Sequence, residues 1–323
     1  MRKKFVQFAA FALALILLPV LPAAALPKEE DEAMIRVGLY YGSSALPGAN
    51  LQNNVGSGYR FGYMDGDTFY EIGFTEETKI SMVKSQNVWY SSSLPEGGYG
   101  YSDQITSNIV VGCYHLCLSE TYDTFEEAQE EADDVGGFPA WIQGEYQVRI
   151  GAYTTQEEAE EAAREWDDVD VVGTSSYGIT VVTTGTDQPI FQFDGGRSDP
   201  TILVVRPGLN DKKKTVTYFK SKTYYGSFCY ERINGGDLTG VNLVSLEDYI
   251  RGILPYEMSN SWPLEALKAQ AVCARSYTMT NLNRHSSYHF DICNTTPGIL
   301  RDWKCQRQHR PSGKRDKRSI RLV

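Results

Sequence analysis

The feature that most constrains the fold is a pattern of strands and helices that repeats within residues 107–172. Its predicted elements run strand, helix, strand, strand, helix, strand, at residues 108–114, 125–134, 138–142, 146–150, 157–166 and 169–172. Thr124 and Glu127 form a capping box that starts the first helix, and Thr154 or Thr155 caps the second. This order predicts a split βαββαβ sheet with both helices on one face.

The same segment carries aromatic side chains that could stack on sugar rings, namely Tyr114, Trp141, Tyr146 and Tyr153. The alternative interpretation is that these rings are simply part of a hydrophobic core. The run Tyr-Gln-Val-Arg-Ile-Gly-Ala-Tyr at 146–153, followed by a helix rich in Glu and Ala, resembles the SPOR family. SPOR domains bind peptidoglycan glycan strands from which the stem peptides have been removed. The resemblance implies a glycan-binding domain at 105–185.

A second segment, at residues 241–277, contains a candidate acid for cleaving glycosidic bonds. Ser245 caps a helix that Pro255 should end, and Pro263 starts another helix. Glu257 lies in the break between these helices, beside a tyrosine and a methionine. The acid in such a reaction must stay protonated near neutral pH, which apolar surroundings favour. Glu257 is therefore the candidate catalytic residue, and the alternative is an ordinary surface glutamate in a loop.

Residues 241–258 and 261–277 closely resemble the SpoIID/LytB family. Sporulation members of this family are lytic transglycosylases that cut bare glycan strands, and the resemblance implies that Glu257 acts as their acid and base. Such an enzyme needs no second carboxylate, because the 6-hydroxyl group of the sugar itself attacks the anomeric carbon. Gln270 and Arg275 could contact polar groups of the substrate. The alternative for Arg275 is that it anchors its helix to a neighbouring carboxylate.

The resemblance continues to Thr296 and then stops. Some relatives hold a zinc ion in this region with one histidine and two cysteines. His289 and Cys293 could be two of those ligands, but the second family cysteine is absent, and Cys305 lies beyond the match. For His285 and His289 we favour exposed loop histidines, so no cofactor is predicted.

Residues 297–323 form a tail that differs in composition from the rest of the chain. It holds nine Lys or Arg residues against two Asp, although the whole chain has a net charge of −10. One hypothesis is that a frameshift replaced the C-terminal half of the family domain. The other is a natural basic tail attracted to anionic wall polymers. The negative charge of the chain as a whole argues against a nucleic-acid partner.

The N-terminus predicts export. A basic start at residues 2–4 precedes an apolar run at 5–18, and the small residues at 23–25 suit a signal peptidase. The alternative is an uncleaved N-terminal anchor, and in either case the rest of the chain lies outside the cytoplasm. Six cysteines in an exported chain could form disulfides, but we expect Cys113 and Cys117 to be small buried hydrophobes.

Together these patterns predict an α+β protein with a SPOR-like split sheet and a truncated, mixed α/β SpoIID-type domain. The predicted division is a signal peptide at 1–25, a β-rich segment and linker at 26–104, the SPOR-like domain at 105–185, the SpoIID/LytB-type part at 190–296 and the tail at 297–323. The predicted function is lytic cleavage of denuded peptidoglycan strands during sporulation, by a secreted or envelope protein. The alternative is a non-catalytic protein that binds the wall through its SPOR-like domain. Other sporulation proteins of the wall could be further partners.

Overall fold

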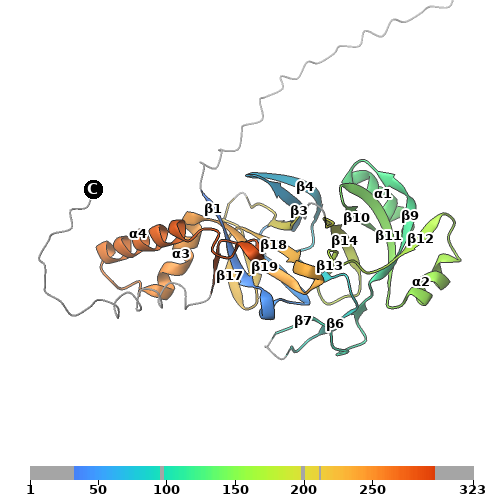
Figure 1. Cartoon of the computed structure of the whole chain (residues 1–323), viewed down its shortest axis with the longest axis horizontal. Coiled ribbons are helices and arrows are strands. Elements are labelled where there is room, and N and C mark those ends of the chain that lie inside the picture. Colours follow the sequence, from blue (N-terminus) through green and yellow to red (C-terminus); the bar gives the residue numbers. More distant parts are fainter. Residues whose placement is uncertain (1–32, 95–97, 198–200, 211, 295–323) are drawn as a thin grey trace, which may run out of the picture. The chain divides into compact units, whose positions relative to one another are not determined.

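The computed structural model describes residues 33–94, 98–197, 201–210 and 212–294 (Figure 1). The predicted signal peptide and basic tail lie outside these ranges. Within them strands predominate over helices, so the mixed α and β character predicted from the sequence is confirmed. No described helix is both long and apolar enough to cross a membrane.

Strands from both ends of the described chain share a seven-stranded sheet. Its members within the described ranges are β1 (Met34–Tyr40), β3 (Tyr59–Asp65), β4 (Thr68–Thr75), β15 (Leu203–Pro207), β18 (Ser227–Arg232), β19 (Leu238–Ser245) and β20 (Ile292–Cys293). Their order is β20-β1-β19-β18-β15-β3-β4, with a parallel pair only between β20 and β1. Strands of the predicted 26–104 segment thus pair with strands of the predicted 190–296 domain, which the sequence did not predict.

The remaining described strands form a ten-stranded and a three-stranded sheet. The larger one contains β2 (Gly48–Val55), β5 (Lys79–Lys84), β9 (Tyr114–Tyr122), β10 (Phe138–Ile142), β11 (Glu145–Tyr153), β12 (Val169–Val172), β13 (Ile179–Thr183), β14 (Pro189–Asp194), β16 (Val216–Phe219) and β17 (Lys222–Tyr224). Its order is β12-β9-β11-β10-β14-β13-β5-β2-β16-β17. The smaller one has the order β7-β6-β8 and contains β6 (Val88–Ser91), β7 (Gly100–Ser102) and β8 (Val110–Val111).

The two large sheets pack over a shared hydrophobic core, to which strands of both contribute buried side chains. Alternation along each strand decides which residues reach this core. On β18, Phe228 and Tyr230 point into it, whereas Cys229 and Glu231 belong to the opposite face. That outer face carries a second, smaller apolar cluster around Cys229. The sheet is therefore apolar on both sides at its centre.

The predicted βαββαβ segment forms the β12-β9-β11-β10 end of the ten-stranded sheet. Its helices are α1 (Phe125–Val135) and α2 (Gln156–Ala163), and Leu118 and Val135 contact the apolar clusters under both, which places the two helices on one face. Both capping boxes are present, and Thr155 is the cap of α2. The order of these elements was predicted from the sequence, but the first strand, expected at 108–114, is β9 at Tyr114–Tyr122. The assignment of the segment to the SPOR family remains a prediction.

This segment is an insertion whose two ends are neighbours. The segment begins after Lys84, the last residue of β5, and ends before Ile179, the first residue of β13. These two residues are paired across β5 and β13. The backbone N–H of Ser85 also donates to the carbonyl of Gly178, at 3.0 Å. Residues 85–178 can therefore be traced as an excursion from one antiparallel pair of strands.

Arg232 fixes the returning end of the excursion. Its side chain is buried, and the guanidinium donates hydrogen bonds to the backbone carbonyls of Ser175, Gly178, Gly235 and Gly236. Burial lowers the pKa of this group from its ordinary value. One buried arginine thus satisfies two carbonyls at the returning end of the insertion and two carbonyls that follow β18.

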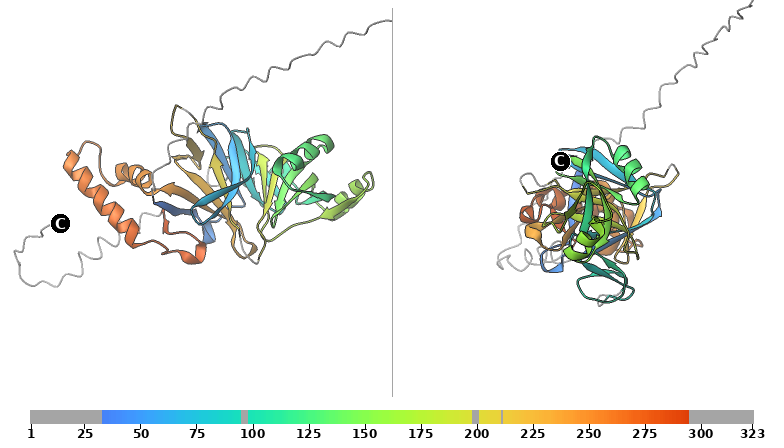
Figure 2. Two further views of the ribbon diagram at one scale, coloured as in Figure 1. Left: turned by 90° about the horizontal axis from the view of Figure 1, so that it is seen from above. Right: turned by 90° about the vertical axis from the view of Figure 1, so that its right-hand side faces the viewer.

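Two helices follow β19, namely α3 (Leu246–Glu257) and α4 (Leu264–Thr280), and they extend beyond the sheets (Figure 2). Ser245 caps α3 as predicted. The prediction that Pro255 ends α3 is wrong, because the helix continues to Glu257. A proline this near the C-terminal end removes one backbone hydrogen bond from a helix that stops two residues later. Short 3-10 helices among the described residues are η1 (Gly42–Ser44), η2 (Ile233–Gly235) and η3 (Ser286–Tyr288).

A buried histidine predicts that the fold weakens in acid. His115 on β9 is fully buried; its Nδ1 lies 2.7 Å from the carbonyl of Gly151, and burial lowers its pKa from 6.5 to about 4. Between these pH values the unfolded chain binds a proton that the folded chain excludes. Stability present above pH 6.5 is therefore lost as the pH falls toward 4, by about 3 kcal/mol.

The measurement is urea unfolding at several pH values, with His115→Gln as the comparison. The variant should lack this part of the pH dependence. Both proteins should still lose stability as their surface carboxylates become protonated. An equal fall in stability for both proteins would show that His115 does not cause it.

Candidate functional site

Glu257 is the last residue of α3 and lies half-buried beside α4. The side-chain amide of Gln270 on α4 donates a hydrogen bond to the Glu257 carboxylate. Burial raises the pKa of the Tyr249 phenol, and the nearby Glu257 carboxylate adds to that rise. The structure thus brings together two residues that the sequence singled out, Glu257 and Gln270, and it gives Gln270 a role in positioning the carboxylate.

Exposed apolar side chains surround the connection between α3 and α4. Tyr256 is 85% exposed, Trp262 is 53% exposed and Leu264 is 64% exposed. The sequence predicted apolar surroundings for Glu257, and on this side they take the form of side chains open to solvent. Exposed aromatic residues grouped in this way are typical of a binding surface.

The Arg275 guanidinium is engaged within the protein and is not available to contact a substrate. Its guanidinium forms a two-point ion pair with Glu247 of α3, with N–O distances of 2.8 and 2.7 Å. The same hydrogen bonds raise the pKa of Arg275 and lower the pKa of the Glu247 carboxyl. The structure therefore shows the alternative role for Arg275, which anchors α4 to α3.

The four aromatic residues of the predicted glycan surface form two separate pairs. Trp141 lies opposite Tyr146 across β10 and β11, while Tyr153 lies opposite Tyr114 across β11 and β9. Trp141 is buried, and its ring stacks on Phe193 with centroids 5.4 Å apart. The three tyrosines are half-buried against the clusters under the helices. They do not share one open face.

The cysteines and histidines do not form a metal site within the described ranges, where no group of three or more potential ligands is present. Cys113 and Cys117 are buried and unpaired, in agreement with their prediction as small hydrophobes. His289 is exposed, as predicted, and its Nδ1 lies 2.7 Å from a carboxylate oxygen of Glu231. His285 instead stacks on Phe290, with ring centroids 4.8 Å apart. Cys305 lies outside the described residues.

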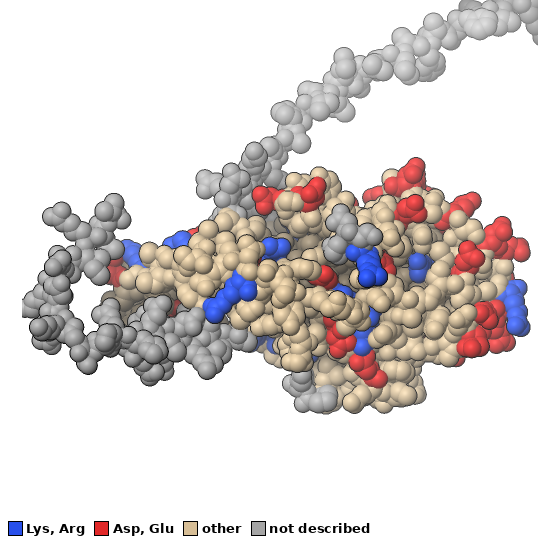
Figure 3. Space-filling view, in the orientation of Figure 1, with Lys and Arg blue, Asp and Glu red and all other residues tan. Residues whose placement is uncertain are grey.

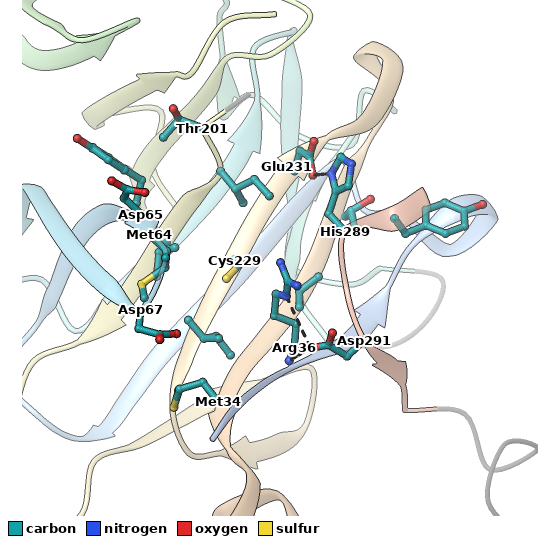
Figure 4. Close-up of a pocket in the computed structure, with 18 of the residues that line it drawn as sticks. Met34, Arg36, Met64, Asp65, Asp67, Thr201, Cys229, Glu231, His289 and Asp291 are labelled. Carbon is teal, nitrogen blue, oxygen red and sulfur yellow. Dashed lines mark hydrogen bonds and ion pairs between the residues drawn. The ribbon is translucent and has the colours of Figure 1, made fainter. Parts of the chain in front are cut away.

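A groove that the sequence did not predict lies on the outer face of the seven-stranded sheet (Figure 4). Its volume is about 790 Å³, and Glu257 does not line it. Figure 4 shows Asp65 and Asp67 on one side of it, and the Glu231–His289 pair on the other, with Cys229 between them. These residues come from segments far apart in the chain. Only the strand pairing assembles them, which is why no local motif pointed to the groove.

Acidic side chains gather over α1 and α2 (Figure 3). Most of these residues are exposed, and they are Glu126, Glu127, Glu130, Glu131, Asp133, Asp134, Glu157, Glu158, Glu160 and Glu161. A surface of this charge disfavours anionic ligands such as nucleic acids or phosphate-rich polymers.

Comparison with known proteins assigns the segment that carries Glu257. Residues 234–317 match the SpoIID family, described as stage II sporulation protein. The SpoIID match includes α3, α4 and the pair of Glu257 with Gln270. It runs past Thr296, where the sequence resemblance was expected to end, and into the basic tail. The end at Thr296 was therefore placed too early.

A further match is shorter. An uncharacterized protein of Brachyspira hyodysenteriae is 47% identical over 74 residues, which are 23% of this chain. The matched part spans 20% of that relative. No solved structure matches the chain significantly. The SpoIID match indicates a sporulation-related cell-wall function.

Proposed function

We propose that the protein is an exported peptidoglycan-remodelling enzyme, a lytic transglycosylase that cuts denuded glycan strands with Glu257 as its acid and base. The observation that carries this proposal is the position of Glu257 within the SpoIID match. Its carboxylate is held by Gln270, and the exposed rings of Tyr256 and Trp262 lie close to it in the chain.

In this reaction the Glu257 carboxyl first gives its proton to the oxygen of the leaving sugar. The carboxylate then takes the proton of the 6-hydroxyl group, and the oxygen of that group attacks the anomeric carbon. The glycosidic bond breaks, an anhydro ring forms, and no water is consumed. The proton taken from the 6-hydroxyl group leaves Glu257 protonated and ready for another cycle. The amide of Gln270 keeps the carboxylate in place between the two steps.

The second candidate is a non-catalytic wall-binding protein that acts outside the cytoplasm. The observation that favours it is that Glu257 does not line the groove on the seven-stranded sheet. In this case the βαββαβ segment and the groove would hold glycan that another enzyme cuts.

Incubation of the purified chain with amidase-treated sacculi separates the two candidates. The enzyme should release soluble fragments with anhydro-sugar ends, detected by mass spectrometry, whereas the binder should sediment with the sacculi and release none. Fragments with ordinary reducing ends would contradict the transglycosylase, because they would require water as the nucleophile.

A further inference from the structure

We propose that the groove on the outer face of the seven-stranded sheet binds a neutral sugar ring, at a site separate from Glu257. The choice of an N-acetylated amino sugar as the probe rests on the proposed cell-wall function. Recognition of a neutral sugar ring follows from the groove itself.

The floor of the groove is an apolar strip made by three strands in register. Val204, Cys229 and Val241 lie side by side on β15, β18 and β19. Burial raises the pKa of the Cys229 thiol to about 12, so this side chain stays protonated and serves as apolar surface rather than as a nucleophile. A flat apolar floor of this kind suits the C–H face of a sugar.

Aromatic rings close the strip at both ends. The register continues from Val204 to Gly62 and from Val241 to Gly38. A side chain at either glycine would collide with a ring, that of Phe69 over Gly62 and that of Phe290 over Gly38. The glycines are needed because the rings pack directly on the backbone, and the floor is therefore bounded rather than continuous with the surface.

Carboxylates dominate the polar rim. Asp65 and Asp67 are exposed, and neither carboxylate has a hydrogen-bond or ion-pair partner in the part of the chain that the structure describes. Glu231 is mostly buried and is held by His289 at 2.7 Å. Carboxylate oxygens accept hydrogen bonds and cannot donate them when ionised, so this rim fits a ligand that is rich in hydroxyl donors.

The charge of the rim excludes an anionic ligand. Arg36 is the only Lys or Arg among the described residues that line the groove, and Asp291 engages it. Asp291 accepts the backbone N–H of Arg36 at 2.8 Å, and the Arg36 side chain lies 3.6 Å from the same carboxylate oxygen. A phosphate or carboxylate ligand would meet uncompensated acidic groups. A neutral ring with an apolar face and a hydroxyl edge satisfies both floor and rim.

Trp141 links this groove to the inserted segment. It lines one end of the groove beside Tyr63, with ring centroids 5.6 Å apart. The sequence assigned Trp141 to a glycan surface together with Tyr114, Tyr146 and Tyr153, and the structure places it beside Tyr63 in the groove. The groove is thus lined jointly by the inserted segment, through Trp141, and by the seven-stranded sheet.

The test is calorimetric titration of the whole chain with a tetramer of N-acetylglucosamine. We expect saturable binding, and Asp67→Asn and Glu231→Gln should each raise the Kd about fivefold or more. The matched control is Asp187→Asn, which alters an exposed aspartate between β13 and β14, and it should change the Kd less than twofold. Circular dichroism confirms that each variant is folded, and the exposed position of Asp67 protects that variant from a folding defect.

Three outcomes would overturn the proposal. The tetramer does not bind the wild-type chain, it binds with a Kd that neither groove variant changes, or a diamine binds the groove while the tetramer does not. The last result would make the groove a cation site. Failure of this proposal and failure of the enzymatic one are distinguishable, because Asp67→Asn and Glu231→Gln should raise the Kd of the tetramer whether or not the wild-type chain releases anhydro-sugar ends.

Discussion

Replacing Glu257 with glutamine is expected to reduce the release of anhydro-sugar ends by about 10²–10⁴-fold, the usual contribution of a positioned acid and base. Glutamine keeps the shape of the side chain and can still bond Gln270 through its amide oxygen, but it has no proton to give. The rate is measured on amidase-treated sacculi, with binding to the same sacculi measured by sedimentation. Cleavage should be lost and binding kept.

Glu265→Gln is the matched control, since it removes an exposed carboxylate from the neighbouring helix, where it pairs only with Lys268 among the described residues. It should cleave at the rate of the wild type. Substantial turnover by Glu257→Gln would remove Glu257 from the mechanism. A parallel loss of binding would mean that the substitution damaged the α3–α4 connection instead of the chemistry.

Replacing Arg232 with methionine should lower the free energy of unfolding by about 3 kcal/mol or more. Methionine fills similar space, but it leaves the carbonyls of Ser175, Gly178, Gly235 and Gly236 without their donor. Water cannot readily replace that donor, because the arginine is only 2% exposed. Urea unfolding followed by circular dichroism measures the change.

Arg60→Met provides the comparison for this measurement. Arg60 forms an exposed ion pair with Glu71 at 2.5 Å, and pairs of this kind contribute at most about 1 kcal/mol. If the two arginine variants lose equal stability, the buried carbonyl network does not explain the cost. Limited proteolysis adds a second readout, since loss of Arg232 should expose the chain near residues 175–178 to cleavage.

Local patterns were sufficient for the elements that are fixed by residues close in sequence. The capping box of Thr124 with Glu127 and the cap at Ser245 placed the starts of α1 and α3, because a helix start is decided within one turn. The end of α3 was misplaced because Pro255 was read as a stop, although a proline near a helix terminus costs little.

The sheets could not be predicted in the same way, because their partners are distant in sequence. Nothing near Val204 indicates that Cys229 lies beside it, and nothing near Cys229 indicates Val241. The groove depends entirely on these pairings. Glu257 could be found because the residues that mark it are close in sequence. Its partner Gln270 was singled out as a substrate contact and is instead bound to Glu257 itself.

The pairing of Lys84 with Ile179 also has a consequence for synthesis. As the chain leaves the ribosome, β1 and β3 appear long before β19 and β15, with which they pair. Until then, these edges of β1 and β3 have no strand partner. The insertion contains its own local partners, so it can fold while the flanking strands are still incomplete. The middle of this protein should therefore acquire protection from hydrogen exchange first. The two ends should follow together, in one late step that closes the sheet around an already folded centre.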